Sequence, residues 1–106
     1  MTLDTIIEQL RTAKARNLIL RATVSVAMLP ASVVIQLPHT TSEETLDKLK
    51  EFFRATFPHT TIQQWRYALP RDDQQDDMNI ICVSFTVDYM HLKHGAAWYG
   101  PTPLSI

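Results

Sequence analysis

The sequence predicts an α+β protein with a two-layer αββαββ architecture, in which a four-stranded antiparallel sheet carries two helices on one face. Two segments place apolar residues at helical spacing, and each is followed by two segments in which apolar and polar residues alternate. Strands that follow one another closely pair as hairpins, and two such hairpins favour one antiparallel sheet. With 106 residues, 45% of them hydrophobic, the chain can bury a core without a disulfide or a metal.

The first helix is expected from about residue 3 to residue 16. Its apolar residues recur at i, i+3, i+4 and i+7, which places on one stripe Leu3, Ile6, Ile7, Leu10 and Ala13. We expect Asn17 to end this helix.

A hairpin is expected next. Residues 18–28 alternate between apolar and polar side chains and are rich in β-branched residues, which predicts a strand. Pro30 indicates a turn, and a shorter strand follows over residues 33–37 until Pro38 ends it.

The second helix is expected between Thr41 and Pro58. The polar residues 39–42 offer several N-cap candidates, and Thr41 and Glu44 have the spacing of a capping box. The apolar stripe of this helix contains Leu46, Leu49, Phe53 and Phe57. Pro58 cannot continue a helix.

The last two strands are expected over residues 60–69 and 78–89. In the first of them we place Trp65 and Tyr67 toward the helices. Both faces of the second strand are apolar near its start, which is typical of a central strand. Cys82 lies in this strand and is expected to pack in the core like a small hydrophobic residue.

The face of the sheet away from the helices is expected to be mostly polar. The residues that we assign to it are Arg21, Thr23, Ser25, Gln36, Gln64 and Arg66. If this face also carried Ile19 or Ile62, a second subunit would cover it, and we expect a homodimer.

Composition excludes several classes of function. A formal net charge of -1 gives no overall attraction for nucleic acid or for an anionic membrane. The two glycines, Gly95 and Gly100, form neither a dinucleotide-binding fingerprint nor a phosphate-binding Walker loop. The lone Cys82 cannot form an internal disulfide, and the N-terminus has no signal-peptide pattern, so we expect a small soluble cytoplasmic protein.

Residues 1–90 are expected to form a single α+β domain, and residues 91–106 an irregular C-terminal tail with aromatic residues and proline. In that tail, Trp98 and Tyr99 belong to residue types that are common at binding hot spots. Trp98 folding back onto the core is an equally weighted alternative.

The connection between the last two strands is expected to be a solvated acidic loop. Its carboxylates belong to Asp72, Asp73, Asp76 and Asp77. Carboxylates on a projecting hairpin favour association with a basic partner surface. A Ca²⁺ site is disfavoured, because the loop has neither the turn glycine nor the bidentate glutamate of an EF-hand loop.

Two alternatives stay open. The first is a nucleic-acid-binding surface, because four basic residues occur between Gln9 and Ser42 with no acid among them: Arg11, Lys14, Arg16 and Arg21. Basic residues near the end of the first helix are also explained by their favourable interaction with the helix dipole. The second is a metal-dependent enzyme that uses the three-residue spacing of Asp88, His91 and His94.

The sequence favours a non-enzymatic protein. No serine has the flanking glycines of a nucleophile elbow, Cys82 has no feature that would make it a thiolate, and no cofactor is expected. The hypothesis is a small protein-interaction or regulatory accessory protein that acts through the sheet face, the acidic loop and the aromatic tail.

Overall fold

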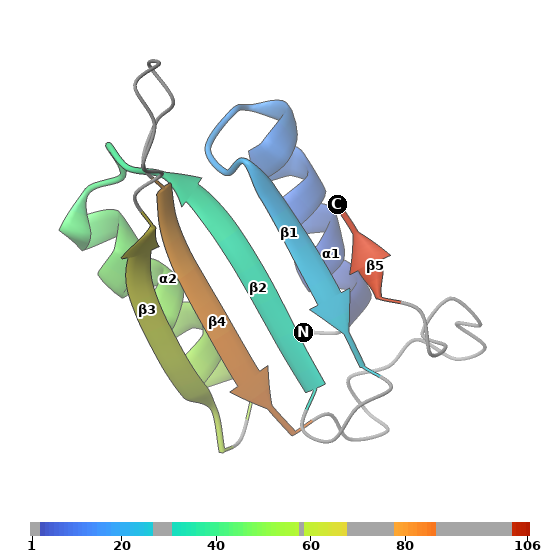
Figure 1. Ribbon diagram of the computed structural model, residues 1–106. Coiled ribbons are helices and arrows are strands. Elements are labelled where there is room, and N and C mark those ends of the chain that lie inside the picture. Colours follow the sequence, from blue (N-terminus) through green and yellow to red (C-terminus); the bar gives the residue numbers. More distant parts are fainter. Residues whose placement is uncertain (1–2, 27–30, 58, 68–77, 87–102) are drawn as a thin grey trace.

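The computed structural model describes residues 3–26, 31–57, 59–67, 78–86 and 103–106, and it is a two-layer α+β fold. The elements in chain order are α1 (Leu3–Ala15), β1 (Arg21–Ser25), β2 (Ala31–Pro38), α2 (Glu43–Thr56), β3 (Thr61–Tyr67), β4 (Met78–Phe85) and β5 (Leu104–Ser105). All strand pairs are antiparallel, in the order β3-β4-β2-β1-β5. Both helices lie behind the sheet, α1 near β1 and α2 near β3 and β4 (Figure 1). The predicted class, αββαββ order and one-sided helices are therefore confirmed.

The sheet differs from the prediction by one strand. Leu104 and Ser105 pair with Val24 and Thr23 of β1 and form β5, which adds a fifth strand at that edge. β1 also starts later than predicted, at Arg21, because the chain leaves α1 through a tight turn over residues 16–18. β2 is longer than predicted and includes Pro38 as its last residue.

The end of α1 is fixed by Asn17, as the sequence predicts. Asn17 has a left-handed backbone (φ 60°), and its N–H donates to the carbonyl of Lys14 at 3.0 Å. The N–H of Leu18 donates to the carbonyl of Ala13 at 2.9 Å. These two bonds form a Schellman motif, in which asparagine is the residue after glycine that best tolerates the left-handed position.

The N-cap of α2 is Ser42, one of the candidates among residues 39–42, and not Thr41 of the capping-box pattern. The Ser42 hydroxyl accepts a hydrogen bond from the backbone N–H of Thr45 at 3.2 Å. A side-chain oxygen at the N-cap satisfies an N–H of the first turn that has no partner within the helix. Because the helix starts at Glu43, Thr41 lies outside it, and its N–H instead donates to the carbonyl of Pro38.

The core lies between the helices and one face of β1, β2 and β4. Along β2 and β4 buried and half-buried residues alternate strictly, which shows that one face of the sheet packs on the helices. The buried residues of the sheet are Ala22, Val24, Ala31, Val33, Ile35, Leu37, Asn79, Ile81, Val83 and Phe85. The side chain of Asn79, the one polar residue buried in the described part of the chain, donates to the Pro38 carbonyl at 3.2 Å.

Aromatic rings connect α2 to the end of β4. The ring of Phe57 stacks on the ring of Phe85 with centroids 4.0 Å apart, and Phe53 stacks on Phe57 at 6.4 Å.

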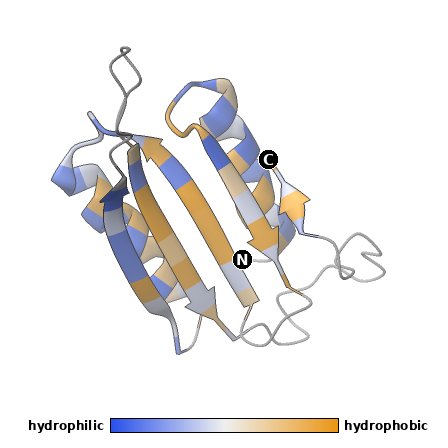
Figure 2. Ribbon diagram, viewed as in Figure 1, coloured by the Kyte–Doolittle hydropathy of each residue, from blue (hydrophilic) through white to orange (hydrophobic). Residues whose placement is uncertain are grey.

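The strands differ in hydropathy. β2 and β4 are largely hydrophobic (orange), and the edge strand β3 is mostly hydrophilic (blue) (Figure 2). None of the described helices is long and apolar enough to span a membrane.

Candidate functional site: the open face of the sheet

The side of the sheet away from the helices is the candidate site, and we call it the open face. Residues directly opposite each other on antiparallel strands share a face, so the register assigns each side chain. The described residues of the open face are Arg21, Thr23, Ser25, Ser32, Val34, Gln36, Pro38, Thr61, Gln63, Trp65, Met78, Ile80, Cys82, Ser84 and Ser105. Neither helix covers this face (Figure 1).

The predicted orientation of β3 is wrong. Trp65 pairs with Ile80, so its side chain belongs to the open face rather than to the helix side. The side chain of Tyr67 lies outside the described part of the chain. Gln64 pairs with the buried Ile81, and Arg66 pairs with Asn79, which places these two polar residues on the helix side. The cause is the position of β3 at the sheet edge, where side chains on both faces stay exposed and apolar character does not decide the orientation.

The open face changes in character from one end to the other. At one end four hydroxyl residues form a row across four strands: Thr61, Ser84, Ser32 and Ser25. At the other end, which we call the apolar end, lie Trp65, Ile80, Met78 and Pro38. Trp65 is 44% exposed, and the other three are half-buried. The apolar end therefore presents an aromatic and aliphatic surface to solvent.

Cys82 lies on this face, beside Gln63 and Val34, and not in the core as expected. Its side chain is half-buried, and its thiol is free. The alternation of β4 explains the difference, since Ile81 and Val83 on either side of it are the residues that face the helices.

Charge on the open face is confined to one corner. Among the described residues of this face, Arg21 is the one charged side chain. It pairs with Gln36, which pairs with Ile80, which pairs with Trp65, so these four residues form one row across the sheet. Three strand spacings of about 4.8 Å separate Arg21 from Trp65 by roughly 14 Å.

The four basic residues of the nucleic-acid alternative belong to different elements of the fold. Arg11 and Lys14 lie on α1, and Arg16 follows directly after it, whereas Arg21 lies on the open face. Arg11 also forms an ion pair with Glu8, with a distance of 3.5 Å between Nη1 and Oε1. The sheet therefore separates Arg21 from the basic residues of the helix layer.

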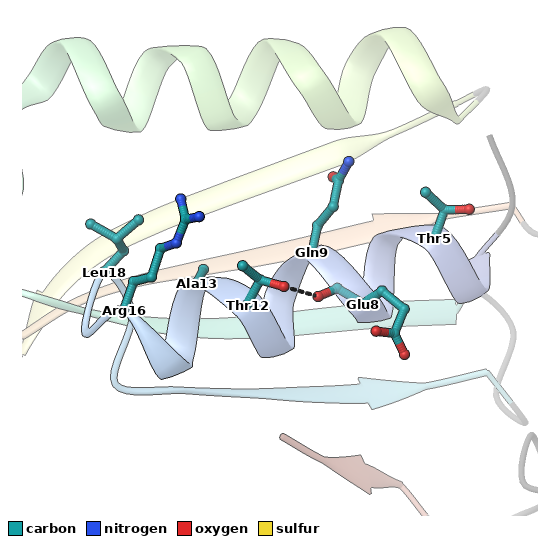
Figure 3. A pocket seen from close by; sticks show the side chains of 7 residues that line it. All are labelled: Thr5, Glu8, Gln9, Thr12, Ala13, Arg16 and Leu18. Atoms are coloured by element: carbon teal, nitrogen blue, oxygen red, sulfur yellow. Dashed lines mark hydrogen bonds between the residues drawn. The ribbon is translucent and has the colours of Figure 1, made fainter.

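A shallow cavity of about 330 Å³ follows the surface of α1. Its lining residues are Thr5, Glu8, Gln9, Thr12, Ala13, Arg16 and Leu18 (Figure 3). The Thr12 hydroxyl donates to the backbone carbonyl of Glu8 at 3.0 Å, within the helix. The Arg16 and Glu8 side chains point to different sides of α1 and do not converge on a common point (Figure 3).

A second cavity of about 220 Å³ lies between the two helices. Ile6 and Leu10 of α1, Ile35 of β2, and Phe52 and Phe53 of α2 line it. The Gln9 amide is the one polar side chain among the lining residues, so the cavity has little with which to orient a polar ligand. It fits an apolar group but contains no chemistry for a reaction.

Several predicted site residues lie outside the part of the chain that the structure describes. They are Asp72, Asp73, Asp76 and Asp77 of the acidic loop, Asp88, His91 and His94 of the metal alternative, and Trp98 and Tyr99 of the tail. Among the described residues, no three His, Cys, Asp or Glu side chains are grouped as a metal site would require.

Trp65 is a site residue that the sequence did not predict. On the opposite face of β3 from Trp65, the residues in order are Ile62, Gln64 and Arg66. One apolar and two polar residues on that face were the available signal that β3 has no clearly apolar face.

Comparison with family models, with curated proteins and with solved structures finds no match to this chain.

Proposed function

We propose that this chain is a non-enzymatic protein-interaction or regulatory protein that binds a protein partner through the open face. The observation that carries the proposal is the apolar end, where Trp65, Ile80 and Met78 adjoin on a face that neither helix covers. Contiguous apolar surface on a small protein marks an interaction site, and tryptophan is enriched among the residues that contribute most to binding.

The acidic loop extends the proposed surface. β3 ends at Tyr67 and β4 begins at Met78, so the loop between them is attached at the apolar end of the open face. The partner surface that fits is therefore apolar with basic residues at its rim, and the acidic residues would speed association. We propose Trp98 and Tyr99 of the tail as further contacts with the partner. We also propose that the protein acts in the cytoplasm.

A charge placed on the apolar end tests the proposal. Ile80→Glu puts a carboxylate at the centre of the proposed surface, and Gln9→Glu adds the same charge at an exposed position on α1. Both variants and the wild-type full chain are used for affinity capture from the native host. We expect Gln9→Glu to retain the partners of the wild type and Ile80→Glu to lose them while its circular dichroism stays unchanged. Equal capture by the two variants contradicts the proposal.

Nucleic-acid binding is the second candidate, and one observation favours it. Arg21 and Trp65 stand on the same cross-strand row, where a guanidinium and a stacking ring would face one strand of nucleic acid. If this candidate holds, a fluorescent single-stranded oligonucleotide binds at low salt, and its affinity falls steeply as salt is raised. Arg21→Gln then weakens binding more than Lys14→Gln does, since Lys14 lies in the helix layer.

A further inference from the structure

The outer edge of β3 has no partner strand among the described elements. β3 is the first strand in the sheet order, and its seven residues pair with β4 on one side alone. The register from Thr61–Ser84 to Tyr67–Met78 runs without interruption, so β3 contains no bulge. Alternate residues of such a strand direct their N–H and C=O groups away from the sheet, where another strand can pair with them.

This edge also carries few of the features that prevent strands from pairing. Residues 61–67 contain neither proline nor lysine, and Arg66 is their one charged residue. Thr61 and Gln63 on the open face and Gln64 on the helix side are exposed. Proteins that keep an edge strand unpaired protect it with prolines, lysines, bulges or a covering segment.

We propose that β3 pairs antiparallel with β3 of a second copy of this chain, around a two-fold axis at Gln64. The axis at Gln64 is the choice that uses all seven residues of β3, and it produces one continuous ten-stranded sheet from two five-stranded ones. Both open faces then lie on the same side of the joined sheet, and all four helices lie on the other.

The side chains of β3 are compatible with this register. Gln64 lies opposite Gln64 of the second copy, so an uncharged pair occupies the axis. Trp65 lies opposite Gln63, and Arg66 lies opposite Ile62. Each of these pairs joins residues of the same face, and the two arginines are kept apart. An axis at Arg66 would instead place the two arginines opposite each other, which is destabilising.

This inference depends on the backbone edge and not on the open face, so it can fail while the proposed function stands. The homodimer expected from the sequence would then form through the edge of β3 and not through the open face. Ile19 is buried in the core, and Ile62 pairs with the buried Val83 on the helix side, so neither residue is on the open face. The condition under which a second subunit would cover that face is therefore not met.

A charge swap at Gln64 tests the inference, because residue 64 is exposed and would lie opposite its own copy. We expect the wild-type chain to sediment as a concentration-dependent dimer of twice 12.1 kDa. Gln64→Lys and Gln64→Glu each place like charges at the axis. The dissociation constant of the dimer is therefore expected to rise about tenfold or more in each variant alone. An equimolar mixture of the two variants is expected to form the dimer again, because the pair at the axis is then Lys opposite Glu.

Gln9→Lys and Gln9→Glu on the exposed surface of α1 are the matched controls, and they are expected to behave like the wild type. Hydrogen exchange supplies a second readout: the β3 amides that point away from β4 are protected in the wild type and lose protection in each single variant. A wild-type chain that sediments at 12.1 kDa at every concentration overturns the inference. A dimer that both Gln64 variants retain, or a mixture that stays monomeric, overturns it as well.

Discussion

Trp65 of β3 lies directly opposite Ile80 of β4 on the face of the sheet that neither helix covers. The next residue of β4, Ile81, is fully buried beneath the helices. Two neighbouring isoleucines therefore belong to opposite faces and to opposite roles, one in the core and one on the proposed binding surface. This difference can be measured.

Truncation of the two isoleucines is expected to separate stability from binding. Ile81→Ala removes buried methyl groups and should lower the free energy of unfolding by about 2–5 kcal/mol. Ile80→Ala acts at a half-buried position and should lower it by less than about 1.5 kcal/mol. Urea unfolding measures both values. Equal losses would mean that the open face is covered in the folded chain.

The cap of α2 provides a test of the choice between Thr41 and Ser42. Ser42→Ala removes the oxygen that accepts the Thr45 N–H, and should lower the free energy of unfolding by about 1 kcal/mol. Thr41→Ala leaves this bond in place and should change stability by less than about 0.5 kcal/mol. Thermal unfolding followed by circular dichroism compares the two, and a larger effect at Thr41 would contradict the assigned cap.

The left-handed backbone of Asn17 predicts opposite effects for two substitutions. Asn17→Gly relieves the steric cost of φ 60° and should leave the protein about as stable or slightly more stable. Asn17→Val should cost about 1–2 kcal/mol, because a β-branched residue is strongly disfavoured there. Chemical denaturation measures the pair. A valine variant as stable as the glycine variant would show that α1 does not end in this motif.

The stacked rings of Phe57 and Phe85 should be energetically coupled. A double-mutant cycle with Phe57→Leu and Phe85→Leu is expected to give a coupling energy of about 0.5–1.5 kcal/mol. Leucine keeps both positions apolar, so the cycle isolates the ring contact from burial. Additive losses in the double variant would argue against this stack as the link between α2 and β4.

Elements with a strong period could be predicted from the sequence. The stripe from Leu3 to Leu10 points to one arrangement, because a core that buries one face of a helix leaves a periodic apolar pattern. Met78 to Phe85 is apolar on both faces near its start, which predicts a central strand but not which face is buried, and Cys82 was therefore misplaced. Asn17 was also predictable, since few residues other than glycine tolerate the backbone that ends a helix in this way.

The orientation of β3 and the existence of β5 could not be predicted in the same way. At the edge the side chains of Thr61, Gln63 and Gln64 are exposed on both faces, so no apolar face identifies the buried side, and pairing with β4 decides it. β5 has two residues and depends on contacts with Val24 and Thr23, about eighty positions earlier in the chain. The division of the basic residues between two layers likewise follows from the fold and not from their spacing.

Hydroxyl-radical footprinting of the full chain, free and in its captured complex, tests the central claim that the open face binds the partner. Trp65, 44% exposed on that face, and Leu18, 59% exposed at the end of α1, are two apolar probes on different surfaces. We predict that oxidation of Trp65 and Met78 falls in the complex while oxidation of Leu18 stays the same. Protection of Leu18 with Trp65 and Met78 unchanged would contradict the claim.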